Sequence, residues 1–174
     1  NASLNNVTVS GLTLGSNGTL NLAGPLKIQP SATGPSFGST TIDGLVTGNG
    51  GLFALQQSLK IGPHFSGSIN SLSLTGGQLE YDPTPAPGHV NTLKLVGSSL
   101  RATTADIRGG LSALGGSQVQ VAEAHISGGL TVDGGSTAQL VGDIVGSSSV
   151  KGASTLAYPF YANAQTRFAN DVTF

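Results

Sequence analysis

Glu123, His125 and Asp143 are the residues whose types and spacing come closest to a chemical site in this sequence. Glu123 and His125 are separated by one residue, so in a β-strand both side chains lie on the same face. Asp143 follows Glu123 by one period of the internal repeat described below, which would place it beside Glu123 on the next coil. Two carboxylates and an imidazole held together in this way could bind a metal ion or transfer a proton.

Solvated polar residues at the corners of a repeat would show the same spacing, and carbohydrate-cleaving sites need further carboxylates, often with Lys or Arg beside them. The other histidines, His64 and His89, stand alone near prolines. A phosphate-binding loop, a Gly-x-Ser-x-Gly motif and the calcium-binding Gly-Gly-x-Gly-x-Asp repeat are absent. We therefore predict no catalytic residue, no metal ligand and no cofactor, and we expect that the protein is not an enzyme. The three residues are retained as a candidate polar cluster.

Charge is scarce along the whole chain. The 174 residues include seven Lys plus Arg and eight Asp plus Glu, for a net charge of −1. Nucleic-acid binding needs clustered cations to neutralise phosphates, so we expect no nucleic-acid partner. No run of 18 apolar residues exists, so we expect no membrane span. Hydrophobic residues make up 37% of the chain, which argues against disorder and supplies a core.

Several features suit an extracellular protein. Cys and Met are both absent, which excludes a disulfide framework and a Cys-based zinc site and removes an oxidisable side chain. The chain does not begin with Met, so we expect a processed mature form or a fragment. Three N-x-[ST] sequons, which begin at Asn1, Asn6 and Asn17, are candidate N-glycosylation sites.

Internal repeats organise the sequence. Residues 69–74 have the same apolar pattern as residues 90–95, at an offset of 21, and residues 107–111 match 126–130 at an offset of 19. The pattern of residues 9–14 also matches 69–74 at an offset of 60, which corresponds to three periods of 20. The repeat is therefore about 20 residues long, with short alternating strands split by Gly-containing turns.

Strands of three to five residues cannot fold alone, but strands stacked one period apart form parallel sheets around a common core. The sequence therefore predicts an all-β fold, a β-solenoid of about eight coils in which Gly-Gly and Asn-Gly corners supply positive φ angles. A β-sandwich is the alternative, because short strands at regular spacing also fit that fold. No segment is predicted to be a helix.

Prolines and aromatic residues mark departures from the repeat. We expect a solenoid domain over residues 1–156, with loops at 29–37 and 82–88 where prolines prevent strand pairing. Residues 157–174 should form a cap or an assembly strand, with a terminal strand over 168–174. The candidate interface residues there are Tyr158, Phe160, Tyr161, Phe168, Val172 and Phe174.

The coils over residues 12–22 and 127–136 resemble those of secreted bacterial β-helical proteins, namely autotransporter passengers and filamentous-haemagglutinin-type adhesins. The resemblance covers residues 4–28 and 66–156 best and rests on coil composition. It implies a secreted, surface-displayed rod used in adhesion or in building a surface layer. Residues 141–156 also resemble coils of bactofilin-type polymers, which are cytoplasmic.

Three functions remain open on the sequence. The first is an extracellular structural or adhesive solenoid that associates with itself in a surface filament or fibre. The second is a β-helix that binds or cleaves carbohydrate, such as host or matrix glycans, through Glu123, His125 and Asp143. The third is a trimeric viral or phage fibre shaft, in which three chains share one core.

Overall fold

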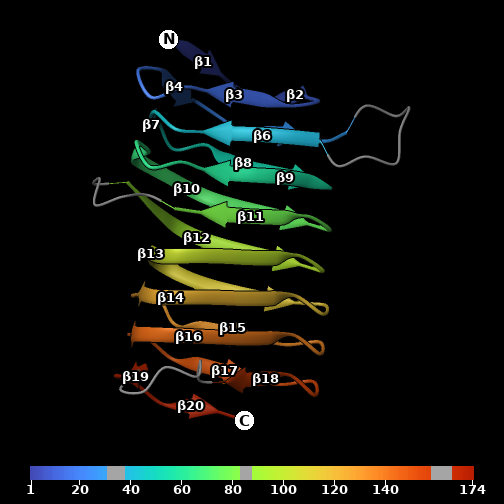
Figure 1. Cartoon of the computed structure of the whole chain (residues 1–174), viewed down its shortest axis with the longest axis vertical. Coiled ribbons are helices and arrows are strands. Elements are labelled where there is room, and N and C mark those ends of the chain that lie inside the picture. The colour runs from blue at the N-terminus through green and yellow to red at the C-terminus, as the bar shows by residue number, and fades with distance from the viewer. Residues whose placement is uncertain (31–37, 83–87, 158–165) are drawn as a thin grey trace.

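The computed structural model of the protein describes residues 1–30, 38–82, 88–157 and 166–174. These residues form β-strands and no helix, and the strand pairings are all parallel. The chain winds into about eight stacked coils, and its two termini lie at opposite ends of the stack (Figure 1). The predicted β-solenoid is confirmed. The β-sandwich alternative is wrong, because a sandwich is built from antiparallel strands.

Each coil contributes one strand segment to each of three faces, and the longer strands continue around a corner from one face to the next. The first face carries the candidate polar cluster. It consists of β1 (Ala2–Leu4), β4 (Thr19–Leu22), β7 (Leu45–Thr47), β19 (Thr166–Phe168) and parts of β10 (Ser66–Thr75), β12 (His89–Val96), β13 (Ser99–Leu114), β14 (Gln118–Ile126) and β16 (Thr137–Ile144).

The second and third faces are built in the same way. The second face consists of β2 (Val7–Val9), β5 (Leu26–Ile28), β8 (Gly51–Leu55), β15 (Leu130–Val132), β17 (Ser148–Val150), β20 (Val172–Thr173) and the last parts of β10, β12 and β13. The third face consists of β3 (Leu12–Leu14), β6 (Gly38–Ile42), β9 (Gln57–Ile61), β11 (Gln78–Tyr81), β18 (Thr155–Ala157) and the first parts of β13, β14 and β16.

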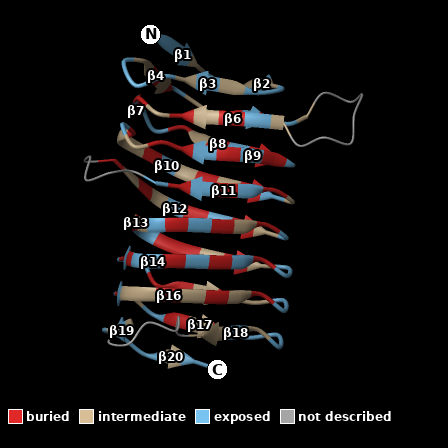
Figure 2. Ribbon diagram, in the orientation of Figure 1, coloured by how far each residue is buried: buried red, intermediate tan, exposed pale blue. Residues whose placement is uncertain are grey.

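Alternate residues of every face point into one core that runs the length of the stack. On the first face Ile69, Val90, Ile107 and Ile126 follow one another in register, and each is at most 1% exposed. Figure 2 shows this alternation as bands of buried and exposed residues along the strands. Burial of one such side chain contributes about 1.5–3 kcal/mol. Because every coil adds several of them, each coil is stabilised mainly by its two neighbours.

Glycine permits the sharp corner between the second and third faces. Gly115 and Gly134 occupy equivalent positions one coil apart and have φ angles of 61° and 65°. These angles favour glycine, because a side chain in the left-handed region is strained. The prediction that Gly-Gly pairs supply positive φ angles at corners is confirmed here. The same prediction for Asn-Gly corners is wrong, because no residue of Asn17-Gly18 or Asn49-Gly50 has a positive φ.

The observed register confirms the repeats at offsets of 21 and 19. Leu72 pairs with Leu93, and Ile107 pairs with Ile126. The match of residues 9–14 with 69–74 is wrong, however, because Val9 lies on the second face whereas Ile69 lies on the first. Val9 and Leu12 flank the corner between the second and third faces, whereas Ile69 and Leu72 flank the corner between the first and second, so the same apolar pattern occurs at both corners.

The predicted loops coincide with breaks between strands. β5 and β6 flank residues 29–37, and β11 and β12 flank residues 82–88. The described positions at the ends of both segments belong to no strand, whereas residues 31–37 and 83–87 lie outside the described part of the chain.

The end of the chain continues the stacking. β19 pairs with β16 on the first face, and β20 pairs with β17 on the second face. The single strand expected over residues 168–174 is instead divided between β19 and β20, because the chain turns a corner at residues 169–171. The described residues of 157–174 thus extend the solenoid by part of a coil.

Candidate functional site

The predicted polar cluster forms part of a longer column of side chains on the first face. Asp106, His125, Asp143 and Arg167 occupy successive coils in direct register. Acidic residues therefore alternate with a histidine and an arginine along the stack. Asp143 neighbours His125 and not Glu123, because the two coils are offset by 18 residues (143 minus 125) at this point and not by the 20 expected from the sequence.

Glu123 lies on the same strand as His125 but belongs to a second column. Its Oε1 is 3.7 Å from Nε2 of His125, and its strand partner in the preceding coil is Thr104. The Glu123 and His125 side chains are 64% and 53% exposed, so water competes for both. In the preceding coil Arg108 pairs with Asp106 at 3.3 Å. The structure brings the three predicted residues together on one exposed face.

A tighter acid–histidine contact lies at the corner between the third and first faces. The main-chain N–H of His64 donates to Oδ1 of Asp43 at 2.8 Å, and its ring Nδ1 is 3.0 Å from Oδ2. The main-chain hydrogen bond is the largest cause that lowers the pKa of the Asp43 carboxyl, and the imidazole contributes in the same direction. This contact connects one coil to the next. The sequence did not predict this structural role, because His64 stands alone near a proline.

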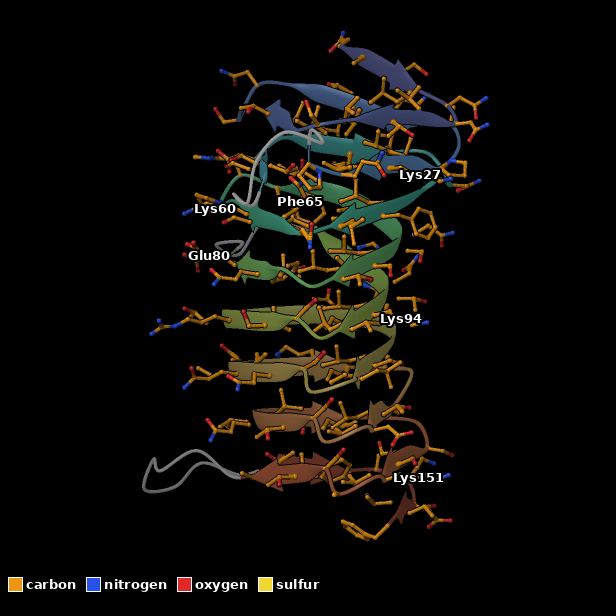
Figure 3. All side chains as sticks on the ribbon, turned by 90° about the vertical axis from the view of Figure 1, so that its right-hand side faces the viewer. Lys27, Lys60, Phe65, Glu80, Lys94 and Lys151 are labelled. Atoms are coloured by element: carbon orange, nitrogen blue, oxygen red, sulfur yellow. The ribbon has the colours of Figure 1, made fainter. Side chains whose placement is uncertain are left out.

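A groove of about 970 Å³ lies over the third face. It extends from β9 across β11, β13, β14 and β16, and its outward-facing residues are mainly Gln, Ser and Thr. Glu80 at one end accepts a hydrogen bond from Nζ of Lys60 at 2.8 Å, and this contact raises the pKa of Lys60. Figure 3 shows Lys60 and Glu80 projecting side by side from this face, with Lys94 on the opposite side of the molecule and Phe65 inside the coils. The sequence offered no sign of this groove, because its residues look like any exposed polar positions.

The sequence also did not predict that three serines would be buried. Ser98, Ser117 and Ser136 lie at the corner between the second and third faces and are at most 4% exposed. The main-chain N–H of Ser98 donates to Oγ of Ser117 at 3.2 Å, and that of Ser117 donates to Oγ of Ser136 at 3.0 Å. The Gly-Gly-Ser sequence that recurs at an offset of 19 could have predicted these serines, because its serine occupies the same corner position in each coil.

Two buried polar atoms flank residues 83–87. Oη of Tyr81 and Nδ1 of His89 have no hydrogen-bond partner within the described ranges. Burial is the largest cause that raises the pKa of Tyr81 above its ordinary value. Tyr81 is the last residue of β11, and His89 is the first residue of β12.

The remaining predicted residues that the structure describes lie at the two ends of the stack. Asn1, Asn6 and Asn17 are exposed, so glycosylation at the sequons stays a prediction that accessibility allows. At the other end Phe168 and Val172 pack partly buried against the core. Phe174 is 86% exposed, whereas Tyr158, Phe160 and Tyr161 lie outside the described residues.

Among the described residues, no group of three or more His, Cys, Asp or Glu side chains is placed to hold a metal ion. No helix in this part of the chain is long and apolar enough to cross a membrane. No protein-family model matches the sequence, and comparisons with curated proteins and with solved structures find no significant match.

Proposed function

We propose that this protein is an extracellular structural or adhesive β-solenoid whose copies associate end to end in a surface filament. The observation that carries the proposal is that the strands of the first coil are paired on one side only. β1, β2 and β3 each pair with only one neighbouring strand in the described structure, through β4, β5 and β6. Strands of this kind present free N–H and C=O groups, which are templates for pairing with another strand.

The apolar residues of this coil support the same proposal. Leu4, Val7 and Leu12 are only partly buried, whereas their counterparts in interior coils are almost fully buried. At the opposite end Phe168 and Val172 are partly buried in the same way. Stacking a second copy on either end would remove this apolar surface from water.

Strand direction favours a head-to-tail arrangement. All pairings in the described stack are parallel, so the last coil of one copy presents strands that run in the direction required by the first coil of the next. A head-to-tail interface generates a filament when it does not close into a ring, and stacking along the solenoid axis does not close. The partner proposed for both ends is therefore a second copy of this chain.

The outer faces fit a structural role in the extracellular medium. They display mainly hydroxyls and amides with few charges, in line with a net charge of −1 for 174 residues, and in the described part of the chain their exposed large apolar residues are Leu45, Phe53, Leu55 and Val145. The core is enclosed by a single chain, with continuous columns of buried residues on the three faces. This enclosure favours a rod made from one chain over a trimeric shaft in which three chains share a core.

Sedimentation velocity over a range of concentrations tests the end-to-end association. We expect the unmodified chain to form larger species as its concentration rises. Val9→Lys places a charge on an inward-pointing position of the free edge strand β2, and inward-pointing charges are one way in which proteins protect such edges. This variant should remain monomeric at concentrations where the unmodified chain associates.

Thr8→Lys is the matched control, because Thr8 lies on the same strand but points outward and is exposed. It adds the same charge without burying it, so it should associate as the unmodified chain does. An unmodified chain that stays monomeric throughout, or a Thr8→Lys variant impaired as severely as Val9→Lys, contradicts association through this edge.

A further inference from the structure

The groove on the third face is lined by outward-pointing residues of five successive coils. The residues between them in the sequence, such as Leu79, Leu100 and Val119, are at most 2% exposed and belong to the core. The backbone of the face is therefore fixed from within, and the outward side chains stand in register on a rigid sheet. Sites built on regular elements of this kind hold their side chains more precisely than loops do.

The first column of the groove consists of direct strand partners in consecutive coils, namely Ser58, Gln78, Ser99, Gln118 and Thr137. Neighbouring strands are about 4.8 Å apart, so the column offers one amide or hydroxyl group at each such interval. Amides and hydroxyls both donate and accept hydrogen bonds. The column thus repeats the same recognition chemistry along the axis of the stack.

The second column consists of Glu80, Arg101, Gln120 and Gln139. Glu80 is paired with Lys60, which lies one coil before it. Two cations, Lys60 and Arg101, and two anions, Glu80 and Asp82, lie in or beside the groove, so their formal charges cancel. A ligand of this surface therefore gains little from carrying a net charge.

From these columns we propose that the groove binds an extended, uncharged polysaccharide lying along the solenoid axis. The interval between coils is close to the length of one pyranose unit, so successive sugars would meet equivalent amides and hydroxyls. Planar Gln amides and the Arg101 guanidinium suit the vicinal hydroxyls of a sugar, which both donate and accept hydrogen bonds. The ligand class goes beyond the filament role proposed above and does not depend on it.

The surface fits other ligands less well. Protein interfaces are centred on buried aromatic or aliphatic residues, whereas Ala122 is the only apolar residue among the described outward positions of the groove. Nucleic acids require clustered cations, and Lys60 is already paired with a carboxylate. Acidic glycans would meet the carboxylates of Glu80 and Asp82.

Titration calorimetry with cellulose-type and chitin-type oligosaccharides tests the proposal. A hexasaccharide of at least one type should bind more tightly than its disaccharide, because it spans more coils. Its affinity should change little with salt, since no net charge is neutralised. The double variant Gln118→Ala, Gln120→Ala removes two exposed amides from the centre of the groove and should weaken binding by about tenfold or more.

Arg101→Gln and Lys94→Gln form a matched pair. Each removes one cation from an exposed position, the first within the groove and the second on the second face. Arg101→Gln should weaken hexasaccharide binding, Lys94→Gln should leave it unchanged, and both should melt at the temperature of the unmodified chain. The proposal is overturned if no hexasaccharide binds, if only acidic oligogalacturonides bind, or if Lys94→Gln weakens binding as much as Arg101→Gln does.

Discussion

Single side chains hold neighbouring coils together at the corners, where strand pairing is interrupted. Oγ of Ser117 accepts the main-chain N–H of Ser98 and donates to the carbonyl of Leu114 at 2.6 Å. Asp43 has a comparable role at another corner, where it accepts the main-chain N–H of His64. At this scale the buried hydroxyls and the corner carboxylate satisfy backbone groups that would otherwise lack partners.

Ser117→Ala should lower the free energy of unfolding by about 1–3 kcal/mol, because it leaves the buried N–H of Ser98 without its acceptor. Urea unfolding followed by circular dichroism measures the change. Ser127→Ala is the control, because Ser127 lies exposed at a different corner and its loss should cost less than about 0.5 kcal/mol. Equal effects of the two substitutions would show that the serine ladder contributes no particular stability.

Asp43 should make stability depend on pH in one direction. Its folded pKa lies below the unfolded value of about 3.9. Its contribution is therefore present above that value and is lost as the pH falls through the folded pKa. Asp43→Asn should lower the free energy of unfolding near neutral pH and have less effect in acid, as measured by urea unfolding at both. A deficit of the same size in acid would contradict a role for the charge.

Among the elements, the alternation of the strands and the Gly-rich corners could be predicted from the sequence because both repeat. Ile107 and Ile126 revealed the period, and the Gly-Gly-Ser turns that follow revealed the corner. The face to which each strand belongs could not be predicted for the first coils, since Leu12 pairs with Thr40, well beyond one repeat length along the chain. Glu123, His125 and Asp143 lie on one face, but Asp143 pairs with His125 and not with Glu123, because the offset there is 18 residues (143 minus 125) and not 20.

Gly128→Ala tests how closely the coils approach at the corner between the first and second faces. A Cβ atom at this position would overlap the main-chain carbonyl of Gly109 in the preceding coil. The substitution should lower the free energy of unfolding by roughly 1–3 kcal/mol, because the backbone must shift to admit it. Gly15→Ala is the control, since among the described residues only its own chain neighbours could lie within 4 Å of the added Cβ. Thermal unfolding of the two variants gives the comparison, and similar melting temperatures would contradict close packing at this corner.

At the scale of the whole molecule, the residues that stabilise the fold lie in one continuous core, whereas the residues proposed for recognition lie on the outer faces and at the ends. The core columns connect each coil to the next, so changes at outward positions such as Gln120 or Lys94 leave the fold intact. The ends differ from the middle, because Leu4 and Val172 are only partly buried. The two proposals can therefore be tested independently, with association assigned to the ends and glycan binding to the third face.

Electron microscopy of the unmodified protein at high concentration tests the central proposal most directly. End-to-end stacking predicts unbranched filaments one solenoid wide, whose axial repeat equals the length of one stack. It also predicts that Val9→Lys abolishes them. Discrete particles one stack long at every concentration would contradict the proposed assembly.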